Sequence, residues 1–116
     1  MIMTLLTDEQ RQQLLANGAL TARGEPHDPV PVVKLYTPDA HATWLLTELD
    51  PRDGDTAYGL CDAGLGNPEL AHVRISDLES IRGPLEHRVV RDLHFKPSST
   101  LSEYVRLAQS DGSIND

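Results

Sequence analysis

The sequence predicts an α+β domain with a four- to five-stranded, mainly antiparallel sheet and about three short helices packed on one face. Three observations predict this class. Helix-start patterns occur near both ends of the chain and once in its second half. The segment 32–95 holds short β-prone runs bounded by turn residues. The gaps between the first four runs are too short for the helical crossovers that parallel strands need, which predicts a meander. A chain of 116 residues has room for one such domain, spanning 1–116.

The first helix is expected over residues 4–18. Thr7 and Gln10 have the spacing of a capping box, in which each side chain accepts from the other's backbone N–H. Asn17-Gly18 is a typical helix stop. The proline-rich stretch 21–31 that follows is expected to be a connecting loop.

The sheet is expected to occupy residues 32–95. Its first four strands are predicted at 32–36, 42–49, 56–62 and 70–75, and turn-rich segments separate them. A fifth strand is predicted at 88–95, with Val89, Arg91, Leu93 and Phe95 on one side.

Two further capping-box patterns predict the remaining helices. Ser76 with Glu79 starts a short helix over 76–82, inserted between the fourth and fifth strands. Thr100 with Glu103 starts a C-terminal helix over 100–109. Residues 110–116 are expected to fray.

Composition excludes several classes of protein. The net charge of −8 argues against direct nucleic-acid binding, which needs a basic surface. No apolar run is long enough for a membrane span, and the N-terminus lacks the features of a signal peptide, so we expect a cytoplasmic protein without a membrane partner. Cys61 is the single cysteine, which excludes an internal disulfide.

No pattern points to catalysis, a metal or a cofactor. The five histidines lack the convergent spacing of a metal site, and their only close carboxylates give the pairs His27-Asp28, Asp39 with His41, and Asp92 with His94. Asp92 and His94 point the same way on a strand, which either an acid–base or metal role or an exposed polar strand face explains. The glycines at 64 and 66 precede a strand rather than a helix, so they do not form a phosphate-binding loop. We therefore expect a binding protein rather than an enzyme, with no catalytic residues, no metal and no cofactor.

Charge is unevenly distributed along the chain. Residues 48–62 carry five carboxylates and one arginine, a net charge of −4, whereas residues 82–96 have a net charge of +2. Carboxylates spaced along a hairpin can resemble a phosphate backbone and attract a nucleic-acid-binding protein. The alternative is an ordinary solvated acidic turn. The five carboxylates are Glu48, Asp50, Asp53, Asp55 and Asp62.

Aromatic residues alternate with charged ones on the same strands. Alternation puts Trp44 with Leu46 and Glu48, and it puts Tyr58 with Asp62, on one face of their respective strands. If the strand registers bring these faces together with Lys34, the result is a mixed surface of rigid rings and charges, as in interface anchors. The alternative is that Trp44 lies in the core under a helix.

Several blocks of the chain, together spanning about residues 4–108, resemble the domain of unknown function family 2958. The blocks are LLTDEQ (5–10), DPVPVVKLY (28–36), TWLLTELDP (43–51), YGLCDAGLG (58–66), PEL (68–70) and RDLHF (91–95). The resemblance implies a small bacterial protein carried by plasmids or other mobile elements, near conjugation and anti-restriction functions. It implies no catalytic residues.

These observations lead us to expect a non-enzymatic acidic accessory protein. Its partner would be a protein with a basic surface, such as a nucleic-acid-binding defence or maintenance protein of the restriction or CRISPR type, which it would inhibit. The partner-binding residues would be Lys34, Trp44, Glu48, Asp50, Asp53, Asp55, Tyr58 and Asp62. One alternative is a small enzyme or ligand-binding domain with a cleft near Lys34, Glu48 and Asp62. A further alternative is a nucleic-acid-binding module that uses Arg82, Arg88, Arg91 and Lys96.

Overall fold

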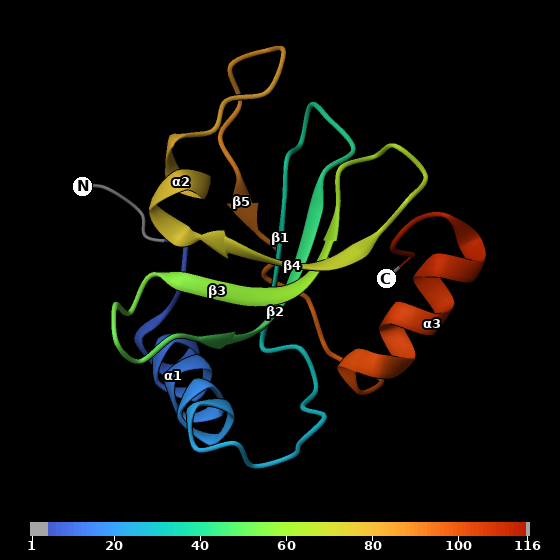
Figure 1. Cartoon of the computed structure of the whole chain (residues 1–116). Coiled ribbons are helices and arrows are strands. Elements are labelled where there is room, and N and C mark those ends of the chain that lie inside the picture. The colour runs from blue at the N-terminus through green and yellow to red at the C-terminus, as the bar shows by residue number, and fades with distance from the viewer. Residues whose placement is uncertain (1–4, 116) are drawn as a thin grey trace.

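A computed structural model describes residues 5–115 and has the predicted α+β fold with an antiparallel sheet. The sheet order is β4-β3-β2-β1-β5, so the first four strands form the predicted meander and β5 returns to the outer side of β1 (Figure 1). The elements are α1 (Asp8–Ala22), β1 (Val33–Tyr36), β2 (Thr43–Leu49), β3 (Thr56–Asp62), β4 (Glu69–Arg74), α2 (Ile75–Ser80), β5 (Val90–Arg91) and α3 (Leu101–Asp111).

The helices cover both faces of the sheet, which corrects the expectation of a single covered face. α1 and α2 pack on one face, in a core cluster that includes Leu46 and Ala57. α3 packs on the other face, against Leu45 and Leu60 (Figure 1). The central strands β2 and β3 carry buried residues at successive positions, so both faces of the sheet need a cover.

The first helix was predicted over residues 4–18 and runs over Asp8–Ala22, so it starts at the predicted Thr7 cap and ends four residues later. Residue 4 lies outside the described residues. The capping box is present: Gln10 N donates to Thr7 Oγ1 at 3.1 Å, and Thr7 N donates to Gln10 Oε1 at 3.0 Å. Asn17-Gly18 does not end the helix, because both residues are buried against β2. A Cβ atom on Gly18 would lie 1.8 Å from Leu49 O, so glycine here allows the helix to approach the strand closely.

Distant aspartates cap the other two helices. Ser76 N and Oγ donate to the two carboxylate oxygens of Asp55, at 2.9 and 2.6 Å, near the start of α2. Ser102 donates in the same way to Asp28 at the start of α3. The predicted boxes at Ser76 and Thr100 are therefore replaced by long-range caps, and neither N-cap residue makes a side-chain cap bond of its own.

The C-terminal third of the chain differs most from the expectation. β5 is only two residues long, so the predicted alternation over 88–95 fails: Val89 is buried on the α1 side, Leu93 is exposed and Phe95 packs against the α3 cluster. Residues 110–116 were expected to fray. Instead α3 extends to Asp111, Gly112 ends it with φ 77°, and Ile114 N donates to Asp62 Oδ2 at 3.0 Å. Residue 116 lies outside the described residues.

Candidate functional site

A β-bulge at Thr47 decides which side chains share a face of the sheet. Leu46 pairs with Gly59, but Glu48 pairs with Tyr58, so one extra residue is inserted in β2. The bulge is held from both sides. Asn17 Nδ2 donates to Thr47 O at 2.8 Å, and Thr47 Oγ1 donates to Tyr58 O at 3.2 Å.

The bulge moves Glu48 away from Trp44. Without it, Glu48 would share a face with Trp44 and Leu46, as simple alternation predicts. In the structure Glu48 lies opposite Tyr58, on the α3 face of the sheet. Trp44 lies on the other face, half-buried and packed against the α1 cluster, so it does not share a surface with Glu48 and Tyr58.

Glu48 and Tyr58 form part of the floor of a groove with a volume of about 610 Å³, which we call the Glu48 groove. The loop after α1 makes one wall, and the first residues of α3 make the other. His72 and Leu70, from the edge strand β4, complete the floor. A second hollow shares Thr21, Glu48, Tyr58 and His72 and extends the groove towards Asp50 and Arg52 in the β2–β3 loop.

The Glu48 carboxylate is oriented by its neighbours. Thr21 Oγ1 donates to Glu48 Oε2 at 2.7 Å and lies 2.7 Å from His27 Nε2. His27 Nε2 is 3.7 Å from the same carboxylate oxygen. Beside this group, the rings of Tyr58 and His72 are tilted by 46° with centroids 4.8 Å apart. The hydrogen-bonded carboxylate of Glu48 thus lies near two aromatic rings in the groove.

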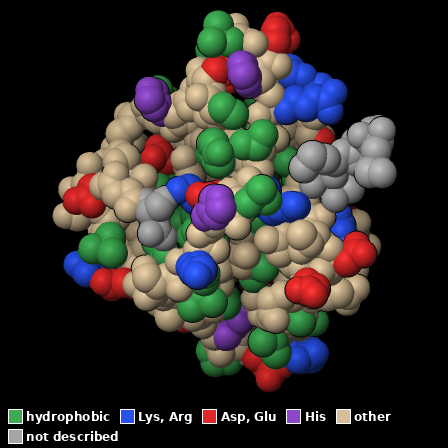
Figure 2. All heavy atoms as spheres, turned by 180° about the vertical axis from the view of Figure 1, so that it is seen from behind, with side chains coloured by type: hydrophobic (Ala, Val, Ile, Leu, Met, Phe, Trp, Pro, Cys, Tyr) green, Lys and Arg blue, Asp and Glu red, His purple; other side chains and the backbone are tan. Residues whose placement is uncertain are grey.

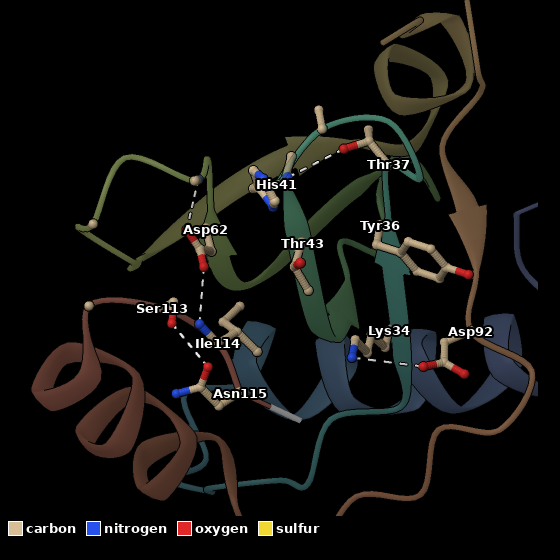
Figure 3. Close-up of a pocket in the computed structure, with 15 residues that line it drawn as sticks. Lys34, Tyr36, Thr37, His41, Thr43, Asp62, Asp92, Ser113, Ile114 and Asn115 are labelled. Atoms are coloured by element: carbon tan, nitrogen blue, oxygen red, sulfur yellow. Dashed lines mark hydrogen bonds and ion pairs between the residues drawn. The ribbon is translucent and has the colours of Figure 1, made fainter. Parts of the chain in front are cut away.

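Lys34 and Asp62 line a different cleft, of about 530 Å³, at the other end of the same face. Figure 3 shows Lys34 with Asp92 on one side and Asp62 with the C-terminal segment on the other, with Thr43 between them. Lys34 Nζ is 3.8 Å from Asp92 Oδ2. Asp62 is buried, and its two oxygens accept from Gly64 N and Ile114 N, so it fastens the wall of this Lys34 cleft.

The three aspartates of the β2–β3 loop are engaged in local structure. Asp53 accepts from Thr56 Oγ1 at 2.6 Å and from the backbone N–H of Thr56 and Asp55, and these bonds lower its pKa to about 2. Hydrogen bonds from Ser76 lower the pKa of Asp55, and those from Arg52 lower the pKa of Asp50. All three carboxylates therefore stay ionised well below neutral pH.

Arginines surround this acidic loop. Arg52 lies 3.1 Å from Asp50, Arg74 lies 3.5 Å from Asp55, and Arg11 donates to Gly54 O at 2.8 Å. Arg11 and Arg74 belong to other elements, so counting charge along residues 48–62 misses them. In the folded protein, the surroundings of this loop are therefore less negative than the net charge counted along residues 48–62.

The arginines of the basic stretch 82–96 make different contacts. Arg82 and Arg88 face each other in an isolated bridge, and Arg91 donates to Leu5 O at 3.0 Å. On the face of the molecule seen in Figure 2, basic side chains lie among acidic, apolar and histidine side chains.

Among the described residues, no cluster of three or more histidine, cysteine or acidic side chains could hold a metal ion. Burial, and secondarily the nearby Glu69 carboxylate, raise the pKa of the Cys61 thiol to about 11. Within residues 5–115 no helix has the length and apolar character of a membrane span.

Of these groove residues, Glu48 and Tyr58 were predicted from the sequence, and Thr21, His27 and His72 were not. Thr21 and His27 belong to the end of α1 and the loop after it, which are far from Glu48 in sequence and carry no motif. His72 sits opposite Tyr58 on β4, so correct pairing of the predicted third and fourth strands could have found it. No local signal places Asn17 at the bulge.

A family model described as "Protein of unknown function (DUF2958)" matches residues 5–115. Neither the curated proteins nor the solved structures yield a significant match.

Proposed function

Because the chain belongs to the DUF2958 family, whose description assigns no function, we propose a function from the geometry of its surface: binding of a protein partner with a basic surface. The protein would act as a non-enzymatic accessory protein of a mobile element. Its partner would be a nucleic-acid-handling host protein, such as a restriction or CRISPR component, which it would inhibit.

The observation that carries this proposal is the pairing of Glu48 with Tyr58 on the floor of an open groove. Two residues expected to bind a partner thus come together through a bulge. The groove also contains the carboxylates of Glu25 and Asp28, and neither lysine nor arginine is among the described residues that line it. A groove with this charge and an aromatic floor complements a basic protein surface.

The β2–β3 loop supplies a secondary contact in this proposal. Asp50 lines the extension of the groove, and the ionised Asp53 and Asp55 lie close to it in sequence. Because neighbouring arginines reduce the negative electrostatic field of these aspartates, we propose that they mainly affect the association rate and its salt dependence. The central contact is assigned to Glu48.

The test is binding to purified candidate partners at about 50 and 500 mM salt. Binding should weaken at the higher salt concentration, and Glu48→Gln should weaken it more than Asp53→Asn. Asp77→Asn, on the exposed side of α2, is a matched control for the loss of one negative charge. Salt-insensitive binding, or equal binding by Glu48→Gln and wild type, would count against the proposal.

A second candidate function is binding of a small polar ligand in the Lys34 cleft. It is favoured by the convergence of Lys34, Thr43 and Asp62 on one hollow closed by the C-terminal segment (Figure 3). A ligand that raises the melting temperature of wild type but not of Lys34→Met would support this function.

A further inference from the structure

The Glu48 carboxylate has one fixed oxygen and one available oxygen. Its side chain is 15% exposed, and Oε2 accepts from Thr21. Among the described residues, Oε1 accepts no hydrogen bond and is not one of the fully buried unpartnered atoms, so it keeps some exposure and a free acceptor position. A carboxylate whose orientation is already set loses little conformational freedom when it accepts a new donor.

The surroundings of this oxygen suit a flat cation. Tyr58 lies directly across the strand pair from Glu48, and its ring contacts that of His72. Leu70 and Leu101 add apolar surface to the groove. A guanidinium group is planar, weakly hydrated and stacks on aromatic rings while donating to a carboxylate, whereas an ammonium group keeps its water more tightly.

The charge of the groove is complementary to such a group. Glu25, Asp28 and Glu48 line it without a lysine or arginine among the described lining residues. Asp28 is committed to the α3 cap and Glu25 is paired with Arg23. Glu48 is therefore the carboxylate best placed to accept from an incoming cation.

We infer that the Glu48 groove binds the side chain of an arginine on the partner protein, with the guanidinium donating to Glu48 Oε1 and stacking against Tyr58 or His72. This inference rests on the proposed function and names the group that the groove recognises. Neither a metal nor a covalent step is involved.

The test is a titration of the full chain with N-acetyl-arginine methylamide, followed by the backbone amide signals in NMR spectra. Saturable shifts are expected at Glu48, Tyr58 and His72. The lysine analogue should bind at least about fivefold more weakly, and the uncharged citrulline analogue should bind more weakly still. Glu48→Gln should lose saturable binding and Tyr58→Leu should weaken it, while Asp77→Asn should retain it.

The inference is overturned if the arginine probe gives no saturable shift in the wild type, if lysine binds as well as arginine, or if Glu48→Gln binds like the wild type. Spectra of each variant without probe establish that it is folded. If the arginine probe fails while a basic partner still binds in a Glu48-dependent manner, the arginine inference falls and the proposed function stands. If the probe binds and no basic partner does, the proposed function falls instead.

Discussion

Asn17 on α1 donates its side-chain N–H to the carbonyl oxygen of Thr47, 30 residues away, at 2.8 Å. Both residues are buried, and Thr47 is the inserted residue of the β2 bulge. This bond links the helix to the bulge that places Glu48 beside Tyr58. The candidate site therefore depends on a residue that does not line the groove.

We predict that Asn17→Ala destabilises the fold and disturbs the groove. The buried carbonyl of Thr47 loses its side-chain donor, which costs about 1–3 kcal/mol of unfolding free energy. Urea denaturation measures this change, and amide shifts of Glu48 and Tyr58 report on the bulge. Gln12→Ala, at an exposed position of the same helix, should change neither. Unchanged Glu48 and Tyr58 signals in Asn17→Ala would contradict this role.

We predict that Gly18→Ala is destabilising, although alanine normally favours a helix by about 0.5–1 kcal/mol over glycine. The new Cβ atom would collide with Leu49 O, a backbone atom that cannot move away by a side-chain rotation. The expected loss is at least about 2 kcal/mol, because the helix must move away from the strand. As a control, Ala16→Gly at an exposed helical position should lower the unfolding free energy only by the difference in helix propensity between the two residues. A stabilised Gly18→Ala would show that the helix does not approach the strand as closely as described.

We predict that Asp55→Ala lowers stability by about 1 kcal/mol, the usual contribution of a helix cap. Asp55 binds both donors of Ser76 although 21 residues separate them. Asp77→Ala removes an acidic residue from α2, the helix that Asp55 caps, and leaves the cap in place. The urea midpoint of Asp77→Ala should therefore be nearer to that of the wild type than the midpoint of Asp55→Ala. Equal midpoints for the two variants would show that the long-range cap contributes nothing.

Stability should fall between about pH 4 and about pH 2. The unfolded carboxylates gain a proton near their usual pKa of 3.8, whereas hydrogen bonds hold the pKa of folded Asp53 at about 2 and lower those of Asp28 and Asp55. The unfolded state therefore binds more protons in this window and gains stability as the pH falls. Melting temperatures of wild type and of a variant with all three aspartates changed to asparagine measure this. The variant should show the shallower pH dependence, and identical slopes would be contrary to the expectation.

The Cys61 thiol should react slowly with iodoacetamide at pH 8. Its raised pKa, about 11, leaves little reactive thiolate in the folded protein. Alkylation followed by mass spectrometry should be many times faster in urea than in buffer. Equal rates would mean that burial does not protect the thiol.

Local signals predicted most of the elements, and long-range contacts account for the errors. The meander followed from the short gaps between strands, and the Thr7 cap followed from the spacing of two residues. Asn17-Gly18 has the composition of a helix stop, yet burial against β2 gives it a packing role. Nothing in residues 43–49 marks Thr47 as a bulge, so alternation assigned Glu48 to the wrong face.

The candidate site was predictable only in part for the same reason. Glu48 and Tyr58 were predicted from their residue types, but their cross-strand pairing depends on the register of β2 and β3. The acidic loop was overestimated because Arg11 and Arg74 approach it from other elements. Lys34 and Asp62 do share a cleft, but it is separate from the groove of Glu48.

The claim that a basic partner binds in the Glu48 groove is tested most directly by site-specific photo-crosslinking in host-cell extract. A photoreactive amino acid would replace either Leu70, in the groove, or Leu107, on α3 outside it; their exposures are similar, at 41% and 43%. We expect a discrete adduct with a basic nucleic-acid-binding protein from position 70, lost at high salt and in the Glu48→Gln background, and none from position 107. An adduct of equal yield from both positions, or one that Glu48→Gln leaves unchanged, would contradict it.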